Sequence, residues 1–266
     1  MKAGASVLSL LASCAVAAQA CAETPRDIYL LLGQSNMAGR GSLVDAPKIS
    51  TDRVYKFGTN DTWEVATPPV HWDGGRGGFG PGLSFGRAMA DAKPGVMVGL
   101  VPCAVGGSSL SRWMPPNGPH YTNMLAKARL ALSAGGVLRG VIWHQGEADS
   151  WNERTAGSYG KRIGILIRAL RKEFGDPGLP FVGGEVAPFY SVSIAKKGGT
   201  SFVAVVNAQE RATLATLPST GFVTVEGLRH GDGGDIVHFE PKSATELGRR
   251  YATEMLRVQK EAESHE

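Results

Sequence analysis

Short apolar runs alternate along the chain with longer segments whose apolar residues recur at helical spacing. A short continuous apolar run is typical of a strand that is buried on both faces of a parallel sheet. Strands are predicted at residues 28–32, 96–101, 137–144, 180–186 and 221–225. Helices are predicted at residues 81–92, 123–132, 155–174, 202–217 and 241–261. This alternation predicts an α/β protein, a three-layer α/β/α sandwich with a central, mostly parallel sheet.

Two stretches outside this alternation are expected to form rim loops. Residues 40–81 are rich in glycine and proline and include Trp72, and their aromatic residues favour an ordered loop over a linker. Their glycine-rich part, residues 74–80, lacks the Gly-Lys-Ser/Thr ending of a phosphate-binding loop and is expected to be a flexible rim. In residues 111–121, Trp113 is either a platform that stacks on a sugar or a packing residue.

The N-terminus has the pattern of a secretory signal. Lys2 precedes a stretch of small and apolar residues, 3–18, and Ala20-Cys21-Ala22 fits a small-x-small cleavage site. The apolar stretch is too short and too rich in alanine to predict a membrane span. We therefore expect a signal peptide at residues 1–22, a single domain at 23–266, and a secreted or periplasmic protein.

The cysteines follow from that cleavage site. A second interpretation of the N-terminus is a lipoprotein, because Leu11-Ala12-Ser13-Cys14 resembles the box in which such proteins are lipidated at the cysteine. In the signal-peptide interpretation, Cys14 and Cys21 leave with the signal and Cys103 remains alone. Cys103 ends an apolar strand pattern and is expected to be an inert core thiol rather than a nucleophile.

Charge and length exclude some classes of partner. The 266 residues carry 28 Lys and Arg against 24 Asp and Glu, a net charge of +4, and the basic residues are scattered. No basic arm interleaved with aromatic residues argues for nucleic acid. A chain of this length can bury a sizeable core in one domain.

The chemistry concentrates at strand ends. Gly33 ends the first strand and permits a sharp turn, which delivers Ser35 at the edge where α/β sheets place their sites. Asp235 and His238, three residues apart, can act as an orienting acid and a base for that serine. The α/β-hydrolase fold shares this order, but its nucleophile elbow is Gly-x-Ser-x-Gly, and Met37 occupies the position of the second glycine.

Four blocks together resemble a known family. They are Gly33-Gln34-Ser35-Asn36-Met37, Gly106-Gly107-Ser108, Trp143-His144-Gln145-Gly146-Glu147 and Asp235-x-x-His238. In this order they resemble the SGNH hydrolase superfamily, and within it the sialic-acid-specific acetylesterase and acetylxylan esterase branch, carbohydrate esterase family 6. Gln34 and Gln145 depart from the general superfamily pattern but agree with this branch.

The resemblance implies a flavodoxin-like fold and a serine hydrolase with the triad Ser35, Asp235 and His238. We expect the amides of Ser35 and Gly107 and the side chain of Gln145 to form the oxyanion hole. Glu147 is a candidate auxiliary acid, either with Asp235 or in its place.

The implied substrate is an acetylated carbohydrate, either xylan or sialic acid, and no metal or cofactor is expected. His144 lies next to an apolar strand without a ligand partner at a useful spacing, and is expected to be structural. Two alternatives stay open: a lipid or thioester hydrolase on the same fold, and a glycan-binding module without activity. Neither the sugar nor the oligomeric state follows from the sequence.

Overall fold

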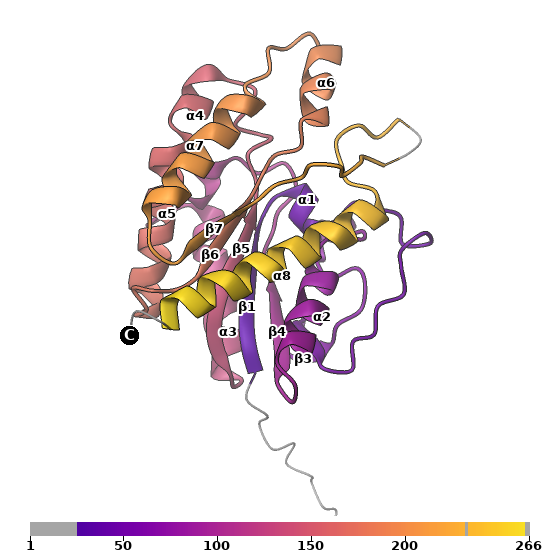
Figure 1. The fold of residues 1–266 in the computed structure, drawn as a ribbon, viewed down its shortest axis with the longest axis vertical. Helices are drawn as coiled ribbons and strands as arrows, with labels where there is room; N and C mark the ends of the chain where they lie inside the picture. The colour runs from indigo at the N-terminus through magenta and orange to yellow at the C-terminus, as the bar shows by residue number, and fades with distance from the viewer. Residues whose placement is uncertain (1–25, 232–233, 264–266) are drawn as a thin grey trace, which may run out of the picture.

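The computed structural model describes residues 26–231 and 234–263. It contains one seven-stranded sheet and eight α-helices within these residues (Figure 1). The strands are β1 (Arg26–Gly33), β2 (Val54–Phe57), β3 (Trp63–Val65), β4 (Met97–Pro102), β5 (Val137–His144), β6 (Phe181–Gly184) and β7 (Thr220–Val223). The helices are α1 (Ser35–Ala38), α2 (Gly82–Ala92), α3 (Pro119–Ser133), α4 (Glu153–Gly157), α5 (Tyr159–Phe174), α6 (Phe189–Lys196), α7 (Val203–Thr216) and α8 (Pro241–Glu263).

The sheet has the strand order β3-β2-β4-β1-β5-β6-β7. Only the edge pair β2–β3 is antiparallel among the described strands, and every other neighbouring pair is parallel. Helices α2 and α8 pack together on one face of the sheet, and α3, α5 and α7 cover the other (Figure 1). The predicted three-layer α/β/α sandwich with a mostly parallel sheet is confirmed.

The central strand β1 shows why the predicted strands formed. Its side chains alternate between two cores, so that Ile28, Leu30 and Leu32 face one layer of helices and Tyr29 and Leu31 face the other. All five are fully buried. Because both faces of a parallel sheet are covered, the strand needs apolar residues at every position and gives an uninterrupted apolar run.

The structure departs from the predicted elements at the edges. Strands β2 and β3 lie inside residues 40–81, where a loop was predicted. They were missed because only Val54 and Phe57 of β2 are buried, and a four-residue edge strand of this kind gives no apolar run. The predicted helix 155–174 is two helices, α4 and α5, which meet at Ser158. Helix α6 follows Pro188 and was not predicted.

The predicted signal peptide, together with Cys14 and Cys21, lies outside the described residues, so the cleavage site and the domain boundary at residue 23 stay predictions. Burial raises the pKa of the remaining thiol, Cys103, to about 12, which agrees with an inert thiol. No helix in the described ranges is both long and apolar enough to cross a bilayer.

Candidate active site

Ser35 is placed by the turn at the end of β1. Gly33 has a φ of +129°, and a Cβ at this position would lie 2.1 Å from the carbonyl oxygen of His144. The next amide, that of Gln34, donates to the same carbonyl at 2.9 Å. Only glycine fits this close approach, and the chain then turns so that Ser35 begins α1 at the carboxyl edge of the sheet.

The structure brings Ser35, His238 and Asp235 into one line of hydrogen bonds. His238 Nε2 lies 3.0 Å from Ser35 Oγ, and His238 Nδ1 lies 2.9 Å from Asp235 Oδ2. The other oxygen of Asp235 accepts the backbone N–H groups of Val237 at 2.9 Å and His238 at 3.1 Å. The carboxylate thus holds both the ring and the backbone of the histidine, which leaves Nε2 free to accept the serine proton.

The charge of Asp235 supports this arrangement. Burial raises the pKa of its carboxyl, but the hydrogen bonds from the His238 ring and from the Val237 amide outweigh burial, and the net pKa is lowered. An ionised Asp235 accepts the Nδ1 proton and stabilises the imidazolium that forms when Nε2 is protonated.

Asn36 connects the serine to the histidine loop. Its Nδ2 donates to Glu147 Oε1 at 2.7 Å and to the Val237 carbonyl at 3.2 Å, and its Oδ1 accepts the Phe239 amide at 3.2 Å. The side chain therefore anchors the segment on both sides of His238 to the residue next to the nucleophile. Sequence reasoning did not single out Asn36, although it stands beside Ser35 in the first block.

Glu147 lies beneath this connection and makes no hydrogen bond to His238 in the described part of the chain. It is only 1% exposed, and its Oε2 has no hydrogen-bond partner among the described residues. Burial raises its pKa to about 7, and the bond from Asn36 opposes that rise. Asp235 therefore hydrogen-bonds the ring of His238, whereas Glu147 hydrogen-bonds the side chain of Asn36.

The structure contradicts the predicted oxyanion role of Gln145. The side chain is fully buried, and Nε2 lies within hydrogen-bonding distance of Asp149 Oδ2 (2.8 Å), Gln34 Oε1 (3.1 Å) and the Ser108 carbonyl (3.1 Å). Its Oε1 accepts the Tyr159 hydroxyl at 2.9 Å, which fixes the orientation of the amide. An amide nitrogen has two hydrogens, so three acceptors leave none for a substrate.

The Ser35 and Gly107 amides differ from Gln145 because both are unused. Neither donates a hydrogen bond to another protein group within residues 26–231 and 234–263. Gly107 is exposed, has a φ of +71°, and has no atom within 4 Å of the position a Cβ would take. The loop before it is anchored to the nucleophile turn, because the Val105 amide donates to the Gly33 carbonyl at 3.0 Å. Open space and a free amide are what an oxyanion donor needs.

A carboxylate from the distant loop holds the residue before Gly107. Both oxygens of Asp73 accept the Gly106 amide at 3.1 Å, and Arg40 forms an ion pair with Asp73. A side chain at Gly106 would collide with both partners. Sequence reasoning missed this contact, because Arg40 and Asp73 lie in a segment without periodicity.

Comparison with known proteins agrees with this geometry. Residues 25–257 match the model of a protein family described as carbohydrate esterase, sialic acid-specific acetylesterase. The chain belongs to this carbohydrate esterase family. It is therefore a hydrolase that acts on esters, and the resemblance drawn from the four sequence blocks is confirmed.

Individual relatives of the esterase support the same assignment. A probable carbohydrate esterase of Arabidopsis thaliana is 33% identical over 198 residues, which are 66% of this chain and 71% of the relative. A solved Arabidopsis thaliana structure has a TM-score of 0.77 at 27% identity, covering 88% of this chain and 98% of the other.

A carbohydrate acetylesterase of Xanthomonas citri has a TM-score of 0.63 at 27% identity, and 88% of this chain matches 56% of that one. The structure of NanS, with a TM-score of 0.69 at 15% identity, shares the fold and covers 90% of this chain and 99% of its own.

The prediction that Trp113 lies at the substrate rim of the esterase is wrong. Trp113 is fully buried, packs edge-to-face on Trp143 at 5.4 Å, and donates its indole N–H to Ser108 Oγ at 3.0 Å. Of the two interpretations left open for Trp113, packing is correct. Trp72, by contrast, is 65% exposed and lines a cavity of about 410 Å³.

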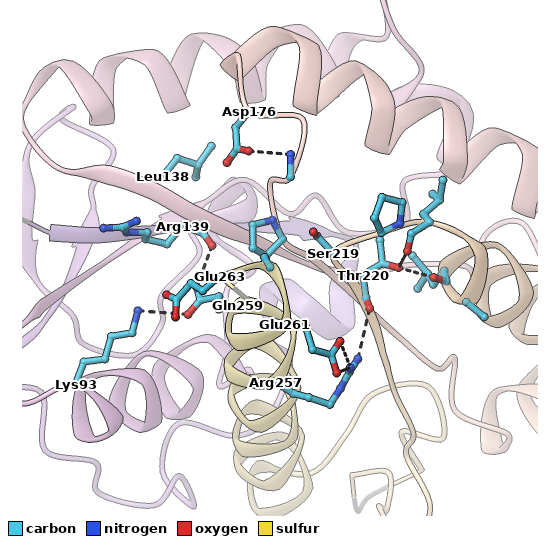
Figure 2. Close-up of a pocket in the computed structure, with 17 residues that line it drawn as sticks. Lys93, Leu138, Arg139, Asp176, Ser219, Thr220, Arg257, Gln259, Glu261 and Glu263 are labelled. Atoms are coloured by element: carbon cyan, nitrogen blue, oxygen red, sulfur yellow. Dashed lines mark hydrogen bonds and ion pairs between the residues drawn. The ribbon is translucent and has the colours of Figure 1, made fainter. Parts of the chain in front are cut away.

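A larger cavity of the esterase, about 800 Å³, is lined by other residues than those of this site, and Figure 2 draws its lining. It is lined by Leu138 and Arg139 at the start of β5, whereas the end of β5 meets the nucleophile turn. Figure 2 shows charged side chains joined to partners, and among them Lys93 donates to Gln259 at 3.3 Å and Arg257 bonds Glu261 at 2.6 Å. Its lining contains neither Ser35 nor His238, so size does not mark the active site.

Proposed function

We propose that this protein is a secreted or periplasmic O-acetylesterase that removes acetyl groups from a carbohydrate, with Ser35 as the nucleophile. The observation that carries the proposal is the hydrogen-bonded line from Ser35 Oγ through His238 to Asp235, at 3.0 and 2.9 Å. A hydroxyl, an imidazole and a carboxylate at these distances form the constellation of serine-dependent acyl transfer.

In the first step, Ser35 Oγ attacks the carbonyl carbon of the acetyl ester while His238 Nε2 takes the hydroxyl proton. Asp235 holds the histidine tautomer and stabilises the imidazolium. The negative charge that develops on the carbonyl oxygen is stabilised by the free amides of Ser35 and Gly107. The protonated His238 then gives its proton to the sugar oxygen, which leaves as a hydroxyl and leaves an acetyl group on Ser35.

In the second step, water replaces the sugar. His238 takes a proton from the water as its oxygen attacks the acetyl-serine carbonyl, and the same two amides bind the second oxyanion. Collapse of this intermediate releases acetate, and His238 returns the proton to Ser35 Oγ. The chain's own side chains and amides thus supply a base, an acid and an oxyanion hole.

The acetyl and carbohydrate parts of the proposal rest on the family and its relatives. The family is described as sialic acid-specific acetylesterase, and the Xanthomonas citri relative is a carbohydrate acetylesterase. The deciding experiment measures acetate released from acetylated xylan and from O-acetylated sialic acid, with Ser35→Ala as the control. Acetate from either substrate, absent in the variant, is the expected result. Hydrolysis of long-chain esters or thioesters without acetate release would favour the lipid hydrolase instead.

The proposed compartment has a separate test. Mass spectrometry of the mature N-terminus should find Glu23 as the first residue and no lipid. A diacylglyceryl group on Cys14 would show that the protein is a lipoprotein.

A further inference from the structure

The cavity of about 410 Å³ borders the proposed oxyanion loop. Its wall contains Val105, one residue before Gly106, and Asp73, whose carboxylate binds the Gly106 amide. It also contains Pro102 at the end of β4, so the cavity lies at the same carboxyl edge of the sheet as Ser35. Its volume falls in the range of about 300–1,000 Å³ that small-molecule sites occupy. The cavity thus adjoins the loop that leads from Val105 to Gly107, although neither Ser35 nor His238 is part of its wall.

The charge of this cavity is not balanced. Lys127, on α3, is half-buried and donates from Nζ to the Pro102 carbonyl at 3.1 Å. No carboxylate of the described residues lies within ion-pair distance of its ammonium group. The carboxylate on the same wall, Asp73, is committed to Arg40 and to the Gly106 amide. An ammonium group without a counter-charge on a cavity wall favours a negatively charged ligand.

The histidines of the wall do not add to the positive charge of Lys127. Burial lowers the pKa of His71 to about 3, and burial, with the Arg112 charge next, lowers the pKa of His120. Both rings are therefore neutral at pH 7. Lys127 and the exposed Arg76, 3.8 Å from Asp73, carry the charge that a ligand would meet.

An aromatic face completes the cavity. Trp72 is 65% exposed although it is the largest apolar side chain of the wall. Indole rings combine a broad apolar face with a polar edge, and they bind flat amphipathic groups such as the C–H face of a pyranose ring. An exposed indole and an unpaired ammonium group on one cavity match the two halves of an acidic sugar.

We propose that this cavity is a subsite for a carboxylate-bearing sugar unit of the acetylated glycan, in which Trp72 stacks on the ring and Lys127 binds the carboxylate. The proposal rests on the function proposed above, and it adds specificity-determining residues outside the triad. A uronic acid and a sialic acid both present this chemistry, and the experiment distinguishes them.

The first test measures binding without turnover. Glucuronate and N-acetylneuraminate are titrated calorimetrically into Ser35→Ala protein and into the same protein carrying Lys127→Met. The expected result is binding of at least one acid that weakens about tenfold or more when the ammonium group is removed, as the loss of one charged contact predicts. The acid that shows the loss identifies the source of the carboxylate. Equal binding with and without Lys127, or no binding of either acid, would overturn the proposal.

The second test uses activity with matched substrates. Lys127→Met should raise KM about tenfold for an acetylated acidic oligosaccharide. It should leave KM unchanged for the carboxyl-reduced form of that oligosaccharide and for 4-nitrophenyl acetate. Trp72→Ala should raise KM for both oligosaccharides, because stacking does not depend on the carboxylate. Lys93→Met, in the cavity of about 800 Å³, is the matched control and should change none of these KM values.

The outcomes separate this proposal from the one it rests on. If wild-type protein releases acetate from carbohydrates but Lys127→Met affects acidic and reduced substrates equally, only the subsite is wrong. If wild-type protein releases no acetate from any carbohydrate, the proposed function and the subsite are both wrong.

Discussion

Two groups of polar side chains meet where β1 ends, and they differ in exposure. In the outer group, the side chains of His238 and Asp235 are 22% and 40% exposed, and they reach Ser35 from a loop. The inner group lies beneath the nucleophile turn and is at most 4% exposed; its members are Gln34, Asn36, Gln145, Glu147 and Asp149. Both groups contain a carboxylate and meet at the end of β1, so the residue types alone do not distinguish them.

The two groups differ in how much of their hydrogen-bonding capacity is still unused. The Gln145 amide has spent both hydrogens, and the Asp149 carboxylate accepts from Gln145 (2.8 Å), the Leu110 amide (2.8 Å) and Arg162 (2.7 Å). Around Gln145 and Asp149 the buried hydrogen bonds fix positions and are costly to break, and they leave no donor for a new negative charge. The outer group has a serine proton to transfer, and the amides of Ser35 and Gly107 have no hydrogen-bond partner among the described residues. A side chain at a strand end therefore takes part in chemistry only if its hydrogen-bonding capacity is not already used.

Loss of the outer nucleophile should have the largest effect. Ser35→Ala removes the attacking oxygen, and triad deletions in a serine protease cost about 10⁶ in kcat. We expect hydrolysis of 4-nitrophenyl acetate to fall to the level given by binding and the oxyanion hole alone. Circular dichroism provides the folding control, and a folded variant with most of its activity would end the proposed mechanism.

The outer acid comes next. Asp235→Asn keeps the shape of the side chain but can leave His238 in the wrong tautomer, at a cost of about 10⁴ in kcat in the serine-protease case. The matched variant Glu147→Gln should stay within about tenfold of wild type, because Glu147 bonds Asn36 and not the histidine. A reversed order of damage would transfer the role of orienting acid to Glu147.

The brace outside both groups should have an intermediate effect. Asp73→Ala frees the Gly106 amide and the loop that presents Gly107. A displacement of about 1 Å at a reacting group can cost about 10² in rate, so we expect kcat to fall by about that factor. KM for 4-nitrophenyl acetate should change much less, because an oxyanion donor acts in the transition state. A change confined to KM would contradict an oxyanion role for this loop.

Loss of the inner amide should reduce stability more than chemistry. Gln145→Ala leaves acceptors on Asp149, Gln34 and the Ser108 carbonyl without their donor, which costs about 1–3 kcal/mol for a buried group left unsatisfied. Urea unfolding measures this loss. If stability is unchanged and kcat falls by about 10²–10³ with KM constant, Gln145 is the oxyanion donor after all.

The smallest effect on activity, and the clearest effect of pH on stability, is expected at Glu147. Its pKa in the folded protein, about 7, exceeds its ordinary value of 4.5, so the folded state holds more protons than the unfolded state between these values. The wild-type free energy of unfolding should therefore fall, relative to that of Glu147→Gln, as pH rises from about 4.5 to 7. Over this pH range, the wild-type free energy of unfolding should fall by up to about 3 kcal/mol more than that of Glu147→Gln. A difference that does not vary with pH would mean that Glu147 ionises freely in the folded protein.

Sequence reasoning succeeded where residues close together in the chain decide the structure. The run from Ile28 to Leu32 predicts a strand buried on both faces, and Asp235 and His238 stand three residues apart on one turn. It failed where the outcome depends on neighbours from elsewhere in the chain. A motif cannot show that three acceptors surround Gln145, or that Asp73 reaches the Gly106 amide.

The two tryptophans illustrate the same limit. Trp72 and Trp113 both lie in loops rich in glycine and proline, and nothing in their local sequence separates a buried indole from an exposed one. Packing against Trp143 buries Trp113, and the cavity beside α3 leaves Trp72 exposed. Tertiary contacts made this distinction, and they are not encoded in either segment alone.

The central claim is that Ser35 is the nucleophile and that His238 activates it. Labelling with a fluorophosphonate tests this directly, because the serine oxygen displaces fluoride from phosphorus and keeps a stable mass tag. We predict one tag per chain, located on Ser35 by peptide mass spectrometry, absent in Ser35→Ala and formed far more slowly in His238→Ala. A tag on another residue, or acetate release by a protein whose Ser35 stays unlabelled, would contradict the account.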